Sequence, residues 1–170
     1  MRYKIQDTRN GAGFTLAELL IALAVTGILL TAVAMAFNAS IINYRQNENI
    51  FKTINGARQA LFRITSQLRT ADAVDPNAPD NECTLITATG DDITYRYNNT
   101  DNKLYLITND DLTDSDYVLC DNVTAMTFTK QTVIVDSQTK VKSVQISIAV
   151  VNGNVQKTLS AAVVIRRNLN

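Results

Sequence analysis

The residues that could do chemistry in this 170-residue chain are few, and histidine is absent. Histidine is the commonest general base and the commonest transition-metal ligand, so its absence lowers the expectation of catalysis. The two cysteines, Cys83 and Cys120, are too few for a zinc site without histidine. No nucleophile elbow, P-loop or dinucleotide fingerprint is present, and we predict that the chain is not an enzyme.

Acidic residues gather at 75–82, at 90–92 and at 109–116. Calcium takes oxygen ligands from loops of this kind. The spacing lacks the glycine and the closing glutamate of an EF-hand, and solvated turns rich in Asp and Asn explain the composition without a metal. We therefore expect no metal site and no cofactor, with bound calcium as the less favoured alternative.

One carboxylate stands in an unusual place, because Glu18 lies at the start of a long apolar run. From Leu19 to Phe37 the run has no charge, and about 20 residues at 1.5 Å each cross the roughly 30 Å hydrocarbon core of a bilayer. Three basic residues precede the run: Arg2, Lys4 and Arg9. Basic residues before such a span mark its cytoplasmic side, which predicts a single-pass protein whose C-terminal part lies outside the cytoplasm.

Three kinds of segment fit this run. A secretory signal peptide would be cut behind it, where Ala34 and Ala36 offer a loose small-x-small site. A plain anchor would stay uncut. A cut before the run, between Gly13 and Phe14, would leave the helix on the mature protein. The residues favour the third, because "GFTLAELL" resembles the recognition site of the type IV pilin and pseudopilin family, which is cut after the glycine.

The resemblance implies a role for each residue of this segment. Residues 1–13 are then the cleaved leader, and Phe14 is the new N-terminus, methylated by the prepilin peptidase. Glu18 is the fifth mature residue, where the family carries the glutamate that recruits and registers subunits. Gly27 matches a glycine often found near the middle of the family's hydrophobic segment.

Glu18 needs a partner, because a carboxylate at the bilayer centre costs about 2.5 to 3.5 kcal/mol. The free amine of Phe14, one helical turn away, is the partner we expect. It could belong to the same chain or to a neighbouring subunit, and the resemblance implies the neighbour. The alternative is a carboxylate held at the headgroup level that contributes little.

Both cysteines follow the apolar run, and so lie on the side of the membrane where disulfides persist. A Cys83–Cys120 bridge would close a loop of roughly 37 residues and stabilise the fold by about 3 to 4 kcal/mol in the chain-entropy model. We expect this bridge. The alternative is two unpaired buried thiols.

After the membrane-spanning part, 14–37, the residues 38–72 predict a continuation of the helix, with no proline and one glycine. Apolar residues recur there at spacings of three and four, which is one stripe on a helix. They are Phe51, Ile54, Ala57, Leu61, Ile64, Leu68 and Ala71. The basic residues of the other face indicate a solvated surface, and nucleic acid is not an expected partner.

The remaining residues, 73–170, predict a globular β-sheet head that begins with a turn-rich loop at 74–82. Alternating apolar residues predict strands at 93–97, 104–106, 123–135, 144–150 and 155–165. "NGN", at 152–154, is a hairpin turn signal. The order of elements predicts α+β architecture: one long helix packed on one antiparallel sheet of about four to six strands. This is also the pilin fold that the resemblance implies.

Within the family, three later stretches look closest to the minor pseudopilin J of type II secretion and its type IV pilus counterpart. They are "ALFRITSQLRTAD", "LCDNVTAMTF" and "VKSVQISIAV…KTLSAAVVIRR". Shaft-forming pilins often have a proline inside the hydrophobic helix, whereas Pro76 and Pro79 lie well outside it. This difference favours a minor, low-copy subunit.

We therefore expect a minor pilin or pseudopilin of the bacterial inner membrane that is extracted into a type IV pilus or a type II secretion pseudopilus. Its expected partners are other pilin or pseudopilin subunits, the prepilin peptidase, the inner-membrane assembly platform and the lipid bilayer. The alternative is a membrane-anchored binding module that grips a secretion substrate, a surface or DNA. A third possibility is a periplasmic enzyme on an anchor.

Overall fold

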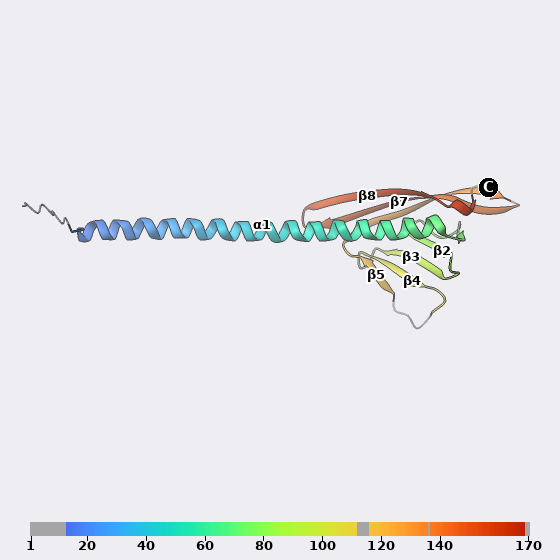
Figure 1. The fold of residues 1–170 in the computed structure, drawn as a ribbon, viewed down its shortest axis with the longest axis horizontal. Helices are drawn as coiled ribbons and strands as arrows, with labels where there is room; N and C mark the ends of the chain where they lie inside the picture. The colour runs from blue at the N-terminus through green and yellow to red at the C-terminus, as the bar shows by residue number, and fades with distance from the viewer. Residues whose placement is uncertain (1–12, 112–115, 136, 169–170) are drawn as a thin grey trace, which may run out of the picture. The chain divides into compact units, whose positions relative to one another are not determined.

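The structure is a computed structural model that describes residues 13–111, 116–135 and 137–168. The chain divides into two compact units, residues 1–45 and 46–170. Helix α1 (Leu16–Thr70) contributes to both units, and the strands of the described residues belong to the second (Figure 1). The expected α+β architecture, with one long N-terminal helix and antiparallel strands, is confirmed.

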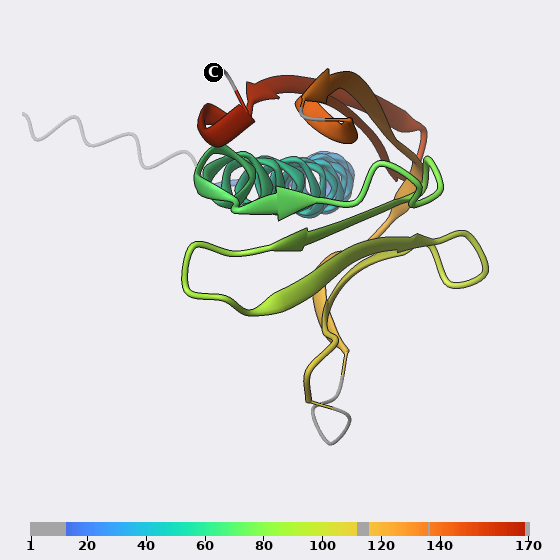
Figure 2. The ribbon, with the colours of Figure 1, turned by 90° about the vertical axis from the view of Figure 1, so that its right-hand side faces the viewer.

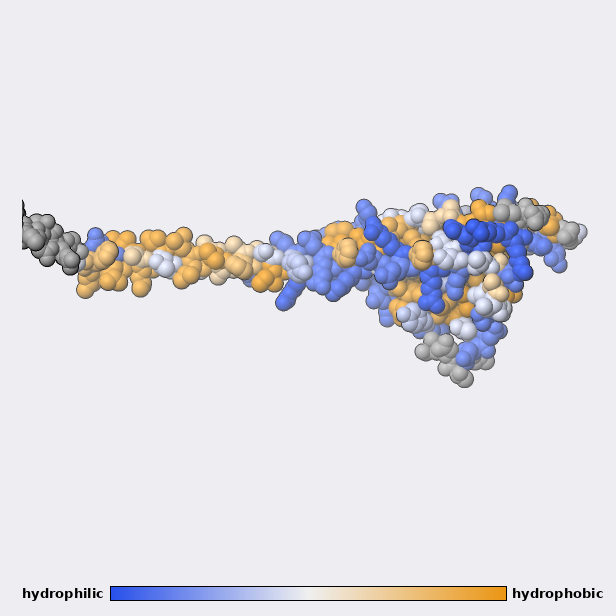
Figure 3. All heavy atoms as spheres, in the orientation of Figure 1, coloured by the Kyte–Doolittle hydropathy of each residue, from blue (hydrophilic) through white to orange (hydrophobic). Residues whose placement is uncertain are grey.

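In the first unit, all described residues of α1 are exposed. Figure 3 shows hydrophobic residues over this part of the helix, whereas hydrophilic residues are frequent on the face of the second unit that is shown. Exposure of so many large apolar side chains is unfavourable in water, so this segment requires a lipid or protein environment.

The second unit contains two antiparallel sheets. The first sheet has five strands in chain order: β1 (Ala73–Val74), β2 (Glu82–Ile86), β3 (Asp92–Asn98), β4 (Lys103–Thr108) and β5 (Tyr117–Cys120). The second has three: β6 (Val123–Val135), β7 (Gln138–Asn152) and β8 (Val155–Val164). A short 3-10 helix, η1 (Arg166–Asn168), follows β8.

Within this unit the C-terminal part of α1 lies between the two sheets (Figure 2). One apolar core joins all three layers. Ile64 and Leu68 of the helix are fully buried, together with Tyr95 of the first sheet and Phe128 and Ile146 of the second. The sheets therefore stabilise the helix from two directions, which explains why a wide face of it is buried.

The expected apolar stripe is confirmed from Ala57 to Ala71. The prediction that Phe51 belongs to it is wrong, because 64% of the Phe51 surface is exposed. Three helical turns are close to eleven residues, so Phe51 is in line with Phe62 and not with Leu61. Phe62 is exposed as well. Ile54, between the two faces, is half-buried.

The expectation of one sheet is wrong, because the strands divide between two. The break falls inside the stretch "LCDNVTAMTF", just before the strand that was predicted at 123–135. Asp121 and Asn122 interrupt it, and Asn122 has a φ of 57°, a left-handed conformation that a strand does not continue. β5 therefore ends the first sheet and β6 starts the second. Strands β1 and β2 were not predicted. β1 has only two residues, and the short alternation of Cys83, Thr84 and Leu85 in β2 was overlooked.

Lys130 on β6 fastens the loop that precedes β2. Its Nζ donates hydrogen bonds to the carbonyl oxygens of Ala78 at 2.7 Å, Pro79 at 3.2 Å and Glu82 at 3.1 Å. The backbone N–H of Phe128 donates to the carbonyl of Asp80 at 2.7 Å. The loop predicted as turn-rich is thus tied to the second sheet by an ammonium group and a backbone hydrogen bond.

Replacing Gly56 by alanine is expected to stabilise the fold by about 0.5 to 1 kcal/mol, because glycine inside a helix is unfavourable. An added Cβ would meet the Sγ of Cys120 at 3.9 Å, an ordinary van der Waals distance. The matched control is Gly153→Ala, which should destabilise, because Gly153 has a φ of 58°. Urea unfolding of the full chain in detergent measures both, and a destabilising Gly56→Ala would contradict the expectation.

Candidate processing and assembly site

The helix begins with a reciprocal pair of polar residues. Thr15 precedes the first helical residue, and its Oγ1 accepts a hydrogen bond from the N–H of Glu18 at 3.2 Å. The Oε2 of Glu18 accepts hydrogen bonds from the N–H of Thr15 at 2.9 Å and from its hydroxyl at 3.0 Å. This is a capping box, which satisfies backbone donors that the first turn leaves unpaired.

Glu18 therefore has a structural role that our interpretation of the sequence missed. The signal was present, since Thr15-Leu-Ala-Glu18 is the T-x-x-E pattern of a capping box before an apolar run. The carboxylate is also placed beside the positive end of the helix macrodipole. Its expected pairing with the amine of Phe14 is not tested, because Phe14 is joined to Gly13 by a peptide bond in this chain.

The expected cleavage site lies just before the capping box. Gly13, Phe14 and Thr15 are outside the helix, and Phe14 is 87% exposed. A Cβ placed on Gly13 would have no neighbour within 4 Å. The backbone at this bond is thus non-helical and accessible, as cleavage by a peptidase requires. Most of the predicted leader, residues 1–12, lies outside the described residues.

The segment behind the capping box is long and apolar enough to cross a membrane. The hydroxyls of its two threonines donate hydrogen bonds to backbone carbonyls of the same helix. Thr26 donates to the carbonyl of Ala22 at 2.7 Å, and Thr31 donates to the carbonyl of Gly27 at 2.5 Å. A Cβ on Gly27 would meet nothing within 4 Å. Neither threonine therefore brings an unsatisfied hydroxyl into an apolar environment.

The predicted Cys83–Cys120 bridge is wrong in this structure, where both cysteines are free and buried. Cys83 lies on β2 and Cys120 on β5, and two strands separate them. Three interstrand spacings amount to about 14 Å, whereas a disulfide requires Cα atoms within about 7 Å. The alternative of two unpaired buried thiols is the one observed.

These thiols are expected to be unreactive in the folded chain. Burial raises the pKa of Cys83 to about 12 and that of Cys120 to about 11, above an ordinary value of 9.0. The folded-state pKa values are the higher ones, so the stability that the protonated thiols contribute is complete below about pH 9 and is lost as the pH rises through 11 to 12.

The corresponding measurement is thiol labelling at neutral pH. Labelling should be slow in the folded chain and rapid in denaturant, and a reducing agent should leave the urea midpoint unchanged. A midpoint that falls on reduction, with an oxidised mass two hydrogens lighter, would show that the bridge forms.

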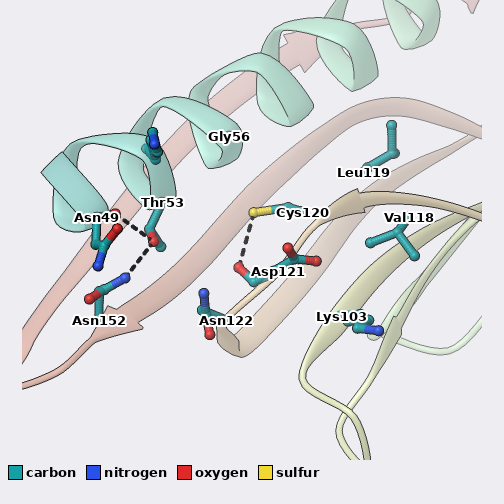
Figure 4. Close-up of a pocket in the computed structure, with 11 residues that line it drawn as sticks. Asn49, Thr53, Gly56, Lys103, Val118, Leu119, Cys120, Asp121, Asn122 and Asn152 are labelled. Carbon is teal, nitrogen blue, oxygen red and sulfur yellow. Dashed lines mark hydrogen bonds between the residues drawn. The ribbon is translucent and has the colours of Figure 1, made fainter.

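A groove of about 530 Å³ opens in the second unit between α1 and the end of the first sheet. Figure 4 shows Gly56 of the helix facing Cys120 of β5, with Asp121 and Asn122 at the turn that follows. Asn152, the last residue of β7, donates its side-chain N–H to the hydroxyl of Thr53 at 3.0 Å. The groove is lined by amides, hydroxyls and charges beside the apolar edge of β5.

Residues of the acidic stretches form hydrogen bonds with other residues of the protein. Asp91 accepts from the hydroxyls of Thr87 and Thr89, and these hydrogen bonds lower its pKa. The N–H of Asp92 donates to Asp110. Within residues 13–111, 116–135 and 137–168, no three His, Cys, Asp or Glu residues gather as metal ligands would. Part of the stretch 109–116 lies outside these residues.

Comparison with known families bears on the N-terminal segment. Residues 8–34 match the family described as the prokaryotic N-terminal methylation motif. This motif is the signal of type IV pilins and pseudopilins, so the resemblance at "GFTLAELL" is confirmed for that signal. With one apolar N-terminal helix, it fits a membrane-anchored, single-pass protein. No curated protein and no solved structure matches the chain, and the likeness to pseudopilin J stays a prediction.

Proposed function

We propose that the chain is a minor pilin or pseudopilin, a structural subunit that is processed at Gly13–Phe14 and inserted into a type IV pilus or a type II secretion pseudopilus. The observation that carries the proposal is the methylation motif at residues 8–34, which covers the expected cleavage site and the start of α1, where the described residues up to Arg45 are all exposed. The absence of proline from that helix supports a low-copy subunit.

The mechanism follows from the chemistry of the segment. Cleavage after Gly13 converts the Phe14 nitrogen into a free amine, which is positive at neutral pH and stays positive after methylation. Glu18 of a neighbouring subunit supplies the opposite charge. In an apolar filament core this pair fixes the axial register of one helix against the next, since an unpaired charge there is costly. The apolar side chains from Leu16 to Phe37 then pack against their counterparts in other subunits.

The test is the intact mass and N-terminal sequence of the chain from membranes of cells with and without prepilin peptidase. A mature chain that begins at Phe14, about 14 Da heavier than its sequence when methylated, is the expected result. It should be absent from the cells without the peptidase. A chain that still begins at Met1 would favour a plain anchor carrying a binding module. A cut after Ala36 would make the head a secreted domain and remove the filament function.

A further inference from the structure

Among the described residues of the second unit, helix α1 has one face that no other element covers. Phe51, Arg58, Phe62 and Arg69 follow one another at spacings of seven, four and seven residues. At 3.6 residues per turn, these positions fall within about 40° of one another and extend along about 27 Å of helix. We call these four residues the Phe/Arg stripe.

The stripe points away from the core. Leu61, Ile64 and Leu68 are buried against the sheets, whereas 64% of Phe51 and 75% of Phe62 are exposed, and both arginines are exposed. Aromatic residues and arginine are the types enriched at the centres of protein interfaces. Two phenylalanines aligned with two arginines therefore have the composition of a docking surface.

The charge of the stripe specifies the chemistry of its partner. From Asn49 to Thr70 the helix carries four cations and no acid. Lys52 pairs with Glu48, and the guanidinium of Arg63 lies 6.0 Å from the centre of the Tyr117 ring. Arg58 and Arg69 have no ion pair with an acidic residue in the described part of the chain. A partner that is both acidic and apolar would complement the stripe.

The same chain presents such a surface on β4 and β5. Tyr105 and Val118 are cross-strand neighbours, and 37% of Val118 is exposed. The hydroxyl of Tyr105 donates to Asp101, and this hydrogen bond, with burial and the charges of Asp101, Asp116 and Asp121, raises the pKa of Tyr105. Three carboxylates therefore influence the ionisation of the Tyr105 hydroxyl. We call Asp101, Tyr105, Asp116, Val118 and Asp121 the acidic patch.

The acidic patch adjoins the groove of Figure 4, which Val118 and Asp121 also line. At about 530 Å³ the groove is large enough to admit a phenyl ring. Two lysines, Lys52 and Lys103, also line the groove. Lys52 pairs with Glu48, and Lys103 offsets one of the three negative charges, which leaves the patch acidic. An aromatic anchor in a pocket with a charge pair at its rim is the usual composition of a strong contact.

We propose that the Phe/Arg stripe of one copy packs against the acidic patch of a second copy, with Phe62 at the groove and Arg58 beside Asp121. The two surfaces differ, so the contact is heterologous and leaves a free stripe and a free patch at the ends, as an open helical assembly requires. The proposal deepens the proposed function, because it joins the heads of neighbouring subunits. For a low-copy subunit, this contact joins the few copies that follow one another in the assembly.

Crosslinking between two differently tagged full-length copies tests the contact in membranes of cells that produce both. One copy carries Ser66→Cys, at an exposed position one helical turn from Phe62, and the other carries Val118→Cys; a short bis-maleimide joins them. Cys83 and Cys120 are buried, so the parent chain serves as the unreactive background. We expect a crosslinked pair only when the two variants are mixed, because a heterologous contact brings neither position close to its own copy.

Charge reversal shows whether the arginine and the carboxylate meet. Arg58→Glu on the first copy should lower the crosslinked fraction about tenfold or more, because like charges face each other, and Asp121→Lys on the second copy should restore it. Lys157→Glu, the same charge change on exposed β8, is the matched control and should have no effect. Urea unfolding of each variant confirms that the head is folded.

Absence of a mixed crosslink, or a crosslink between two Ser66→Cys copies alone, would overturn the proposal. The same holds for a mixed crosslink that Arg58→Glu leaves unchanged. The proposed function fails separately, since it requires a mature chain that begins at Phe14 whether or not the heads touch.

Discussion

Replacing Glu18 by glutamine is expected to lower incorporation into the assembled filament by about a hundredfold or more. Removing one partner of a buried ion pair costs about 3 to 5 kcal/mol, and every tenfold change corresponds to about 1.4 kcal/mol. Glutamine serves at this position of a capping box as glutamate does, so the start of α1 stays intact while the charge is lost. Glu18→Gln thus isolates the charge from the cap.

Thr15→Ala is the matched control, because it removes the capping hydroxyl and keeps the charge. Loss of an N-cap costs about 1 kcal/mol, which a helix of 55 residues tolerates. We expect Thr15→Ala to be incorporated nearly as the parent chain and Glu18→Ala to behave as Glu18→Gln does. Thr15 and Glu18 both lie close to the cleavage site, so the intact mass of each variant must first show that processing is normal.

The measurement is the ratio of the chain in the isolated filament fraction to the chain in membranes. If Glu18→Gln is incorporated normally while Thr15→Ala is not, Glu18 acts through the capping box alone. That result would remove the ion pair with the Phe14 amine from the assembly mechanism. If all three variants are incorporated normally, the result favours the alternative of a membrane-anchored binding module.

Replacing Lys130 by methionine is expected to destabilise the head by about 1.5 to 3 kcal/mol, the range for hydrogen bonds to charged groups. The variant keeps the apolar stem and removes the ammonium that donates to the carbonyls of Ala78, Pro79 and Glu82. Those carbonyls lose a shared donor, and the loop between β1 and β2 loses a tie to the second sheet. Urea unfolding of the full chain in detergent gives the free-energy difference.

Lys142→Met is the control for Lys130→Met, because Lys142 is an exposed lysine on β7 and the change in charge is the same. A surface substitution of this kind should alter stability by less than about 0.5 kcal/mol. Amide hydrogen exchange should also be faster at 75–82 in Lys130→Met and unchanged in the control. Equal stabilities for the two variants would show that the ammonium does not hold the loop.

The parts of the fold that were predicted correctly are those with a local periodic signal. The apolar stripe from Ala57 to Leu68 repeats at three and four residues, and the strand at 123–135 was predicted with the bounds that the structure has. The hairpin between β7 and β8 follows from the turn signal at 152–154, of which Gly153 and Asn154 form the turn. In each case neighbours in sequence provide the pattern, so no tertiary information is needed.

The parts that were wrong depend on contacts between distant residues. The division into two sheets depends on Asn122, whose positive φ separates β5 from β6, and a single asparagine carries only a weak local signal for this. The exposure of Phe51, like that of Phe62, depends on which faces of the helix the two sheets cover. Lys130 meets carbonyls 48 to 52 residues away, and nothing in its local sequence marks it as a clamp.

By itself, the sequence determined the N-terminal segment of this protein: its processing motif, its capping residues and its apolar helix, because each results from interactions within one or two helical turns. Only the tertiary structure decided which head surfaces are free and which cysteines can meet. The Cys83–Cys120 bridge was predicted because the chain has two cysteines and both were expected outside the cytoplasm. The order of the strands instead sets the distance between β2 and β5. Strand order and register arise from packing of the whole core, which a local pattern does not specify.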